Sequence, residues 1–351
     1  MNHDDGVKFQ FRLDGNLFNL RRLQAQTKTN IAHLLELQYA DDCSVLAHSP
    51  EALQRSLAII SNIYQSMGLQ INVNKTEIIS QRNNPAVPLA FQINGEDIKQ
   101  VEKFKYLGSV LTDRHNIDAE IVARINQASA SFGRLRSRVF ENTNLTIKTK
   151  VSVYVAVCLS TLLYGAESWT TYQRHIKQLE SFHIRCLQRI LGLRWQDKVP
   201  HSDILQRART TSIEAMLARK QLRWVGHVFR MPEHRLPRQT LYGQLNEARR
   251  NPGGQKKRYK DQIRTTMKKC NIIPKELETN ASDRKQWRAL CKEGCSQLEI
   301  ARNLAREERR LRRHNQIVAL PANPDLTCQL CGRACGSRIG FFSHTRWHDR
   351  R

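Results

Sequence analysis

The sequence contains no hydrophobic run long enough to cross a membrane. Its longest apolar stretch, residues 151–166, is shorter than the roughly 20 residues that a membrane-spanning helix needs, and it includes Ser152, Ser160 and Thr161. The first five residues do not resemble a secretory signal. The nine cysteines are an odd number and lie scattered outside the C-terminal region, so we expect no extracellular disulfide framework. These features predict an intracellular protein, in the nucleus or the cytoplasm, without a transmembrane segment.

Acidic residues are scarce relative to basic ones. The 351 residues include 57 Lys and Arg against 32 Asp and Glu, which gives a net charge of +25. Such a chain repels itself and is stabilised by a polyanion, so we expect RNA or DNA as the partner. The side chains that we expect to contact phosphates are Lys256, Lys257, Arg258, Lys260, Arg309, Arg310, Arg312, Arg313, Arg338 and Arg346.

These basic groups also have two alternative roles that need no phosphate contact. Each group can be a solvated helix face or a signal for nuclear import. Most of these residues fall into two clusters, within residues 249–269 and 306–314. An anionic membrane surface is not expected as the partner, because neither cluster has a sustained apolar face opposite its charges.

Four residues near the start of the chain, Tyr39-Ala40-Asp41-Asp42, carry the most informative chemistry. They lie between two short apolar runs, residues 34–38 and 43–47, that can both form strands, so the aspartates would lie at the tip of a hairpin. An Asp-rich tight turn explains the pair without any function. A divalent-metal site explains it through the oxygen ligands that Mg²⁺ prefers. The residues that follow favour the metal site.

The segments around this hairpin predict further local structure. Ser49-Pro50-Glu51 is typical of a helix start, and four apolar residues then recur at helical spacing. Gly68 can end this helix, and residues 69–73 predict a strand. Residues 7–18 predict a hairpin with an Asp-Gly turn.

The order of three segments resembles the palm of reverse transcriptases, most closely those of non-LTR (LINE-type) retrotransposons. These segments are Tyr-Ala-Asp-Asp at 39–42, Gly-Leu-x-Ile-Asn-x-x-Lys-Thr-Glu at 68–77 and Phe-x-Tyr-Leu-Gly at 104–108. The resemblance continues past the palm through shorter motifs at residues 163–169, 185–192, 223–227 and 255–261.

The resemblance implies roles for particular residues. Asp41 and Asp42 would bind Mg²⁺, Lys75 would lie near the pyrophosphate leaving group, and residues 104–108 would form the hairpin that supports the primer strand. In the family, another aspartate on an earlier palm strand joins the pair, and Asp14 does not match it. We expect the palm strand that carries that aspartate, the fingers and the endonuclease to be absent. The chain alone is therefore expected to be inactive, with Mg²⁺ bound only if a full-length retrotransposon polymerase completes the site.

The expected fold is α+β with four parts. Residues 1–112 would form a truncated palm of antiparallel strands with a packing helix, and residues 113–195 a helical thumb. Residues 196–320 would form a basic helical region, and residues 326–348 a small ββα zinc finger. Four tryptophans could stack on the bases of a single strand, but core packing is the commoner fate of tryptophan at such spacing, so we expect them in the core and assign them no binding role: Trp169, Trp195, Trp224 and Trp287. Helical periodicity is carried by Ile121, Ile125, Ala128, Phe132, Leu135 and Val139, then by Leu179, Phe182, Cys186, Ile190 and Leu193, then by residues 215–229.

The C-terminal cysteines and histidines have the spacing of a Cys₂His₂ zinc finger. Cys328-x₂-Cys331 is followed, after twelve residues, by His344-x₃-His348. Tetrahedral Zn²⁺ takes two thiolates from a hairpin and two imidazoles one helical turn apart, so we expect Zn²⁺ as a cofactor. Cys335 stands where such fingers usually have a phenylalanine. It is either a small hydrophobic residue of the finger core or a fifth thiol that competes for the metal.

This finger is not expected to read a DNA sequence. Its base-reading helix positions would be Ser337, Gly340 and Ser343. Glycine has no side chain, and serine hydroxyls accept or donate to several bases. The function expected first is therefore a retrotransposon polymerase remnant that retains nucleic-acid binding. The alternative is a sequence-indifferent nucleic-acid-binding zinc-finger protein derived from such an element. A transcription regulator is a third class, which the reading positions disfavour.

Overall fold

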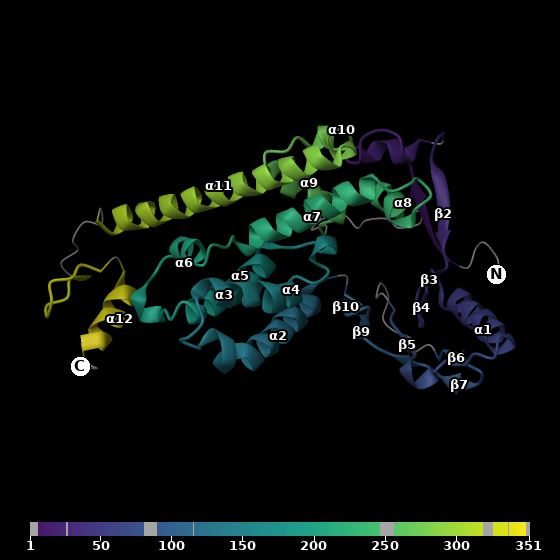
Figure 1. The fold of residues 1–351 in the computed structure, drawn as a ribbon, viewed down its shortest axis with the longest axis horizontal. Helices are drawn as coiled ribbons and strands as arrows, with labels where there is room; N and C mark the ends of the chain where they lie inside the picture. Colours follow the sequence, from purple (N-terminus) through teal and green to yellow (C-terminus); the bar gives the residue numbers. More distant parts are fainter. Residues whose placement is uncertain are drawn as a thin grey trace. The chain divides into compact units, whose positions relative to one another are not determined.

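Short strands gather in the first 112 residues, and helices make up most of the rest (Figure 1). The mixture of helices and small strands agrees with the α+β class. The computed structural model describes residues 6–25, 27–80, 90–114, 116–245, 256–318, 326–335 and 337–348. The chain forms two units, Met1–Gln297 and Leu298–Arg351. Within the described residues, no helix combines the length and the apolar content that crossing a bilayer requires.

A three-stranded antiparallel sheet joins distant parts of the first unit. Its order is β11 (Gly243–Leu245), β1 (Val7–Phe11) and β2 (Asn30–Leu34). The hairpin predicted over residues 7–18 is therefore wrong. Leu17 is instead buried, and its backbone N–H donates to Glu278 Oε1 at 2.7 Å, which turns the chain away from β1.

Four further strand pairs lie between residues 36 and 112. Two are the hairpins of β3 (Glu36–Tyr39) with β4 (Asp42–Val45) and of β9 (Lys103–Tyr106) with β10 (Ser109–Thr112). The others pair β6 (Gln92–Ile93) with β7 (Glu96–Asp97), and β5 (Glu77–Ile78) in parallel with β8 (Lys99–Gln100).

Helix α1 (Pro50–Ser66) begins as predicted. Ser49 caps it by accepting the N–H of Ala52 at 3.2 Å. Leu57 is buried in a small core with Ile78, Phe91, Ile93 and Ile98. This apolar cluster holds the helix against the short strands that follow it.

The strand predicted over residues 69–73 is wrong. Asn72 Oδ1 accepts the N–H of Lys75 at 3.1 Å and caps a 3₁₀ turn, Val73–Lys75. Local side-chain to backbone hydrogen bonding of this kind competes with strand pairing. The alternating apolar pattern of the segment is therefore not used in a sheet.

Residues 118–297 are mainly helical. Their helices are α2 (Asp118–Leu135), α3 (Ile147–Val153), α4 (Ser160–Leu162), α5 (Gln173–Ile190), α6 (His201–Arg207), α7 (Ile213–Phe229), α8 (Leu236–Tyr242), α9 (Tyr259–Lys269), α10 (Leu277–Ser282) and the first part of α11 (Arg284–Val318). Two π-helical stretches, Arg136–Phe140 and Tyr154–Leu159, connect α2 to α3 and α3 to α4. The remaining 3₁₀ turns are Leu20–Gln24, Ala166–Ser168, Trp195–Asp197 and Pro274–Glu276.

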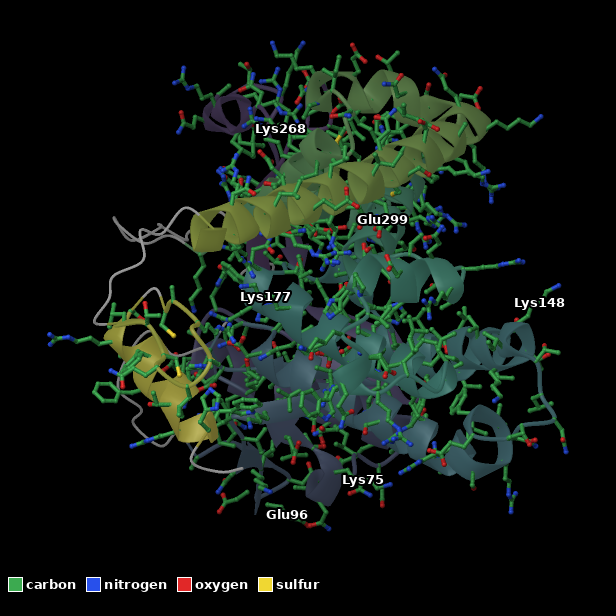
Figure 2. The ribbon with its side chains drawn as sticks, turned by 90° about the vertical axis from the view of Figure 1, so that its left-hand side faces the viewer. Lys75, Glu96, Lys148, Lys177, Lys268 and Glu299 are labelled. Atoms are coloured by element: carbon green, nitrogen blue, oxygen red, sulfur yellow. The ribbon has the colours of Figure 1, made fainter. Side chains whose placement is uncertain are left out.

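One hydrophobic core connects α2 to α7. The two apolar stripes predicted at Ile121 and at Leu179 both lie in it, together with Tyr154, Ile204 and Ile213. The core therefore continues past residue 195, where the sequence analysis places a domain boundary. Charged side chains such as Lys148 and Lys177 cover the outside (Figure 2).

The tryptophans have different environments. Trp169 and Trp287 are buried, as predicted. The same prediction is wrong for Trp195, which is 79% exposed, and Trp224 is half-buried. The described part of the second unit comprises the end of α11, an antiparallel bridge between Thr327 and Ala334, and α12 (Arg338–His348).

Candidate nucleic-acid and metal-binding sites

Asp41 and Asp42 lie at the tip of the β3–β4 hairpin. Tyr39 pairs with Asp42, so Ala40 and Asp41 form a two-residue loop, and Ala40 has a φ of 53°. Positive φ is unfavourable for alanine, which makes this turn a strained one. The side chains of Tyr39, Asp41 and Asp42 are exposed. The hairpin thus presents two adjacent carboxylates to solvent.

These two aspartates lack a third ligand in the part of the chain that the structure describes. Among the described residues, one cluster contains three or more acidic, cysteine or histidine side chains that could bind a metal together. It lies near the C-terminus and does not include either aspartate. Lys75 is exposed in its 3₁₀ turn, and no hydrogen bond or ion pair between it and either aspartate is seen in the described residues. A Mg²⁺ site therefore requires further oxygen ligands.

The second predicted hairpin, β9–β10, lies beside the first. Tyr106 Oη donates to Leu37 O at 3.4 Å, and Leu107 and Gly108 form its loop with φ values of 46° and 82°. Burial raises the pKa of Tyr106, and the negative charge of Asp42 adds to this shift. The structure thus brings the motifs at residues 39–42 and 104–108 together.

A buried ion pair fixes β9–β10 to α2. Glu120 Oε1 accepts from Arg124 Nε at 2.7 Å, and both side chains are at most 5% exposed. Glu120 Oε2 accepts the N–H of Val110 at 2.6 Å, and Arg124 also donates to Gly108 O. The Arg124 guanidinium lies 4.5 Å from the Tyr164 ring centroid. One ion pair therefore joins the hairpin, α2 and the Leu-Tyr-Gly motif.

Glu120→Gln should loosen this hairpin. The variant keeps the side-chain shape but removes the charge that balances buried Arg124, at a cost of about 2 kcal/mol in unfolding free energy. Relative to the wild type, the variant should show faster amide hydrogen exchange in β9–β10, with a much smaller change in α5. Equal exchange rates in the wild type and the variant would show that the ion pair does not hold the hairpin.

The basic residues at 256–260 contact other parts of the protein. Lys256 Nζ donates to Arg114 O at 2.8 Å, Lys257 Nζ to Gln262 Oε1 at 2.6 Å and Arg258 Nε to Asp261 Oδ2 at 3.1 Å. Lys260 Nζ donates to Gly243 O at 2.8 Å, and burial lowers the pKa of Lys260 to about 8. Lys260 thus ties α9 to β11. Phosphate contact by this group stays a prediction.

The arginines of α11 are more accessible. Arg309, Arg310, Arg312 and Arg313 are all exposed, and Arg312 forms an ion pair with Glu308 at 2.6 Å. Arg306, Arg309 and Arg313 follow helical spacing and share one side of the helix. The prediction that no apolar face lies opposite these charges is wrong for α11, where Ile300, Leu304 and Leu311 form an apolar side, each about 60% exposed.

The four predicted zinc ligands come together near the C-terminus, within residues 326–348, the predicted finger. The candidate ligand atoms of Cys328, Cys331, His344 and His348 all lie within 4.8 Å of one another. Cys331 Sγ is 3.1 Å from His344 Nε2, which is 3.2 Å from His348 Nε2. Ligand atoms around tetrahedral Zn²⁺ lie roughly 3.3–3.8 Å apart, so this donor set fits the ion.

The local electrostatics also suit a metal. Desolvation opposes ionisation of Cys328, but hydrogen bonds from the backbone at Leu330 and Cys331 leave its pKa lowered. Desolvation and the nearby His348 lower the pKa of His344, which favours the neutral imidazole that metals bind. Cys335 lies outside the cluster, with Sγ 4.0 Å from Arg333 O, so it does not act as a fifth ligand here.

The helix of the finger presents few groups for reading bases. Ser337 Oγ accepts the N–H of Gly340 at 3.1 Å and so caps α12. Ser343 is exposed, as are Arg338 and Arg346. Two of the three usual reading positions are thus a capping serine and a glycine.

A basic pocket lies between α7 and α11, and none of the sequence predictions includes it. Its residues come from two helices about 60 positions apart, so no local run of charge marks them. The motif Arg223-Trp224-Val225-Gly226-His227 was the available signal.

Comparisons with known proteins agree with the resemblance to reverse transcriptases. Residues 16–111 match the family described as reverse transcriptase (RNA-dependent DNA polymerase). A transposon-derived protein of Caenorhabditis elegans is 24% identical over 274 residues, which cover 75% of this chain and 97% of that protein. The RNA-directed DNA polymerase from the mobile element jockey of Drosophila melanogaster is 24% identical over 177 residues, or 48% of this chain and 19% of the polymerase. No solved structure gives a significant match.

Proposed function

We propose that this chain is a polymerase-derived nucleic-acid-binding protein of the non-LTR retrotransposon type. The exposed arginines of α11, in the same unit as the Cys₂His₂ cluster, carry this proposal. Arginine guanidinium groups bind phosphates at any sequence, and this contact weakens as salt rises. Zn²⁺ held by Cys328, Cys331, His344 and His348 would cross-link the finger and take no part in a reaction.

We also propose that the polypeptide does not polymerise DNA by itself. Nucleotide addition commonly needs two metal ions that clamp the attacking and leaving oxygens. Asp41 and Asp42 have no third carboxylate beside them within the described residues. The turn at Ala40 nevertheless keeps both of them exposed, so they can contribute to a site that another polymerase chain completes.

In such a completed site, Asp41 and Asp42 would bind Mg²⁺ and Lys75 would lie near the leaving group. Primer extension on an RNA template, with the chain alone and with an added full-length retrotransposon polymerase, tests both parts of this proposal. Extension by the chain alone that Asp41→Ala abolishes would contradict the proposed inactivity. Complemented extension that survives Asp41→Ala would contradict the proposed metal ligand.

A sequence-indifferent binding protein without any polymerase role is the second candidate. The capping role of Ser337 and the missing side chain at Gly340 favour it over a transcription regulator. A preferred duplex site, found by selection from random DNA, would instead support a regulator.

Removing two arginines should change the salt dependence of binding. For Arg310→Ala/Arg313→Ala, the slope of log K against log[salt] should fall in magnitude by about 1.4–1.8, since each phosphate contact contributes about 0.7–0.9. Fluorescence anisotropy with a labelled RNA or DNA oligonucleotide measures this slope.

Lys148→Ala/Lys177→Ala is the matched control, because it removes the same charge from an exposed surface outside the finger unit. An equal change in both double variants would contradict a role for α11. Binding to anionic vesicles with no affinity for the oligonucleotide would show that the amphipathic α11 meets a membrane instead.

A further inference from the structure

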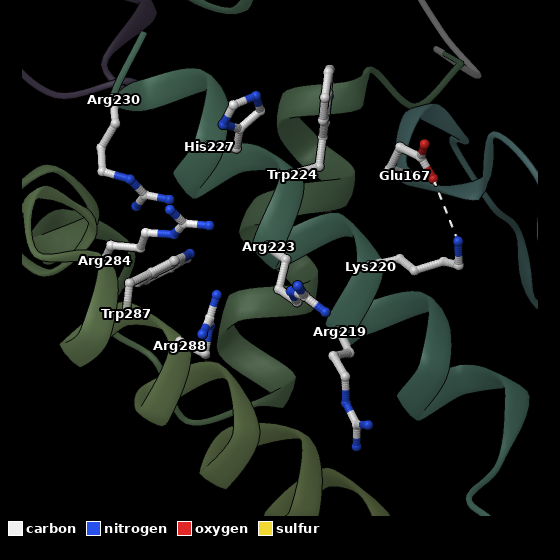
Figure 3. Close-up of a pocket in the computed structure, with 10 residues that line it drawn as sticks. All are labelled: Glu167, Arg219, Lys220, Arg223, Trp224, His227, Arg230, Arg284, Trp287 and Arg288. Carbon is white, nitrogen blue, oxygen red and sulfur yellow. Dashed lines mark ion pairs between the residues drawn. The ribbon is translucent and has the colours of Figure 1, made fainter.

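A basic pocket of about 470 Å³ lies between α7 and the start of α11, inside the first unit. Figure 3 shows arginines from both helices around it, with the Trp224 side chain projecting from α7 between His227 and Glu167. The arginines are Arg219 and Arg223 from α7, Arg230 directly after it, and Arg284 and Arg288 from α11. This site is separate from the finger and from the later arginines of α11.

Close packing of α7 and α11 creates the pocket. Trp287 is 2% exposed, and its Nε1–H donates to Leu222 O at 2.9 Å. Gly226 leaves room for the indole, since a Cβ there would lie 2.1 Å from Nε1. The same contact places Arg284 and Arg288, one turn apart on α11, beside the arginines of α7.

The lining of the pocket carries a large excess of positive charge. It includes five arginines and Lys220 against one carboxylate, Glu167, which lies 3.8 Å from Lys220 Nζ. The carboxylate of nearby Asp283 instead accepts backbone N–H groups at the start of α11. Arginines remain protonated at neutral pH, so an anion that enters the pocket relieves their mutual repulsion.

The arginines at one end already repel each other. The guanidinium groups of Arg230 and Arg284 point toward one another beside Trp287 (Figure 3). Burial lowers the pKa of Arg230, and the charges of Arg284 and Arg288 lower it further, while Asp283 opposes this shift. Arg230 also donates to Ala281 O at 2.7 Å, which holds it in this position. The protein therefore keeps Arg230, Arg284 and Arg288 close together, and Asp283 offsets only part of their positive charge.

The aromatic ring and the extent of the charge favour a strand over a free phosphate. Trp224 is half-buried, with the His227 ring 5.6 Å from its own, and it lines the same pocket as Arg223, so a base can stack on the indole while its phosphate meets a guanidinium. Arg219 and Arg230 are eleven residues apart along α7, or about 16 Å, which is longer than one phosphate group.

We propose that this pocket binds a single-stranded segment of RNA or DNA, with phosphates on the arginines and a base stacked on Trp224. The inference rests on the proposed nucleic-acid binding and adds a second site, in the body of the first unit. It also gives a role to the Arg-Trp-Val-Gly-His motif. The basic residues draw in the strand, and the glycine lets α11 contribute to the pocket.

Anisotropy with a labelled twelve-nucleotide single strand tests the charge contacts. Arg284→Gln/Arg288→Gln should weaken binding by the full chain about tenfold at moderate salt, while Lys148→Gln/Lys177→Gln should change it less than twofold. In the Arg310→Ala/Arg313→Ala background, the pocket substitutions should cause a further loss of the same size. Equal losses from the pocket and control substitutions would overturn the second site.

Tryptophan fluorescence tests the stacked base. The single strand should quench the wild type, and Trp224→Leu should lose that part of the quenching and weaken binding severalfold. Trp224→Phe should restore affinity, because phenylalanine also stacks. An abasic strand or poly-glutamate that binds as tightly as the normal strand would overturn base recognition and identify a general polyanion site.

These outcomes separate this inference from the proposed function. If the wild type binds no nucleic acid, the proposed function fails. If it binds with a steep salt dependence that only the Arg310/Arg313 substitutions reduce, the function stands and the pocket proposal fails. Tight binding of inorganic phosphate or a mononucleotide, with no gain for a longer strand, would contradict a strand-binding site.

Discussion

Zinc removal is expected to unfold residues 326–348 and to leave the first unit folded. The finger has little core of its own, because Leu330, Ile339 and Phe342 are 74%, 84% and 63% exposed. Ordering each residue costs about 1–2 kcal/mol of conformational entropy, which so small a core does not offset. Metal binding contributes about 10–16 kcal/mol in fingers of this type, so the fold of the finger depends on it.

Chelator titration followed by NMR measures this effect, with resonances of the finger and of α5 read in the same spectra. Cys328→Ser should lose zinc and the dispersion of the finger signals. Cys335→Ser should retain both, because Cys335 lies outside the ligand cluster. A finger that stays folded after complete zinc removal would contradict the metal site. Zinc loss caused equally by both substitutions would contradict the assigned ligand set.

Local signals in the sequence predicted the parts that the structure brings together. The hairpin at residues 39–42 follows from two short apolar runs around a tight turn, and α1 follows from its Ser-Pro start. The hairpin at residues 104–108 was expected from the family resemblance. The Cys₂His₂ cluster follows from spacing, because the two histidines are one turn apart on α12. Each of these features is fixed within about 25 residues, so the sequence alone contains enough information.

The strand predicted over residues 69–73 fails through a local cap at Asn72, but the larger errors come from contacts between distant residues. β1 pairs with residues 30–34 and 243–245 instead of with its neighbour, because Leu17 is held by Glu278. The pocket between α7 and α11 depends on an indole that fits against a glycine about 60 positions away. No periodicity or motif spacing encodes such a contact, and a single sequence does not reveal it.

Gly226→Ala is expected to destabilise the first unit by about 3–5 kcal/mol, as much as the loss of a buried tryptophan. The new Cβ would lie 2.1 Å from Trp287 Nε1 and 2.3 Å from its Cδ1, so the indole must leave its place. Its hydrogen bond to Leu222 O would be lost as well. Urea unfolding followed by circular dichroism measures the change in free energy.

Gly133→Ala in α2 is the matched control, because apart from its chain neighbours and the backbone of its own helix, no atom of the described residues lies within 4 Å of the Cβ it would add. It should stabilise the protein by about 0.5–1 kcal/mol, since alanine loses less backbone entropy than glycine in a helix. Combined with Trp287→Leu, Gly226→Ala should cost much less than it does alone, because the two residues contact each other. Similar effects of the two glycine substitutions would mean that α7 and α11 do not pack through Trp287. The arginines of the pocket would then have no fixed arrangement with which to bind a strand.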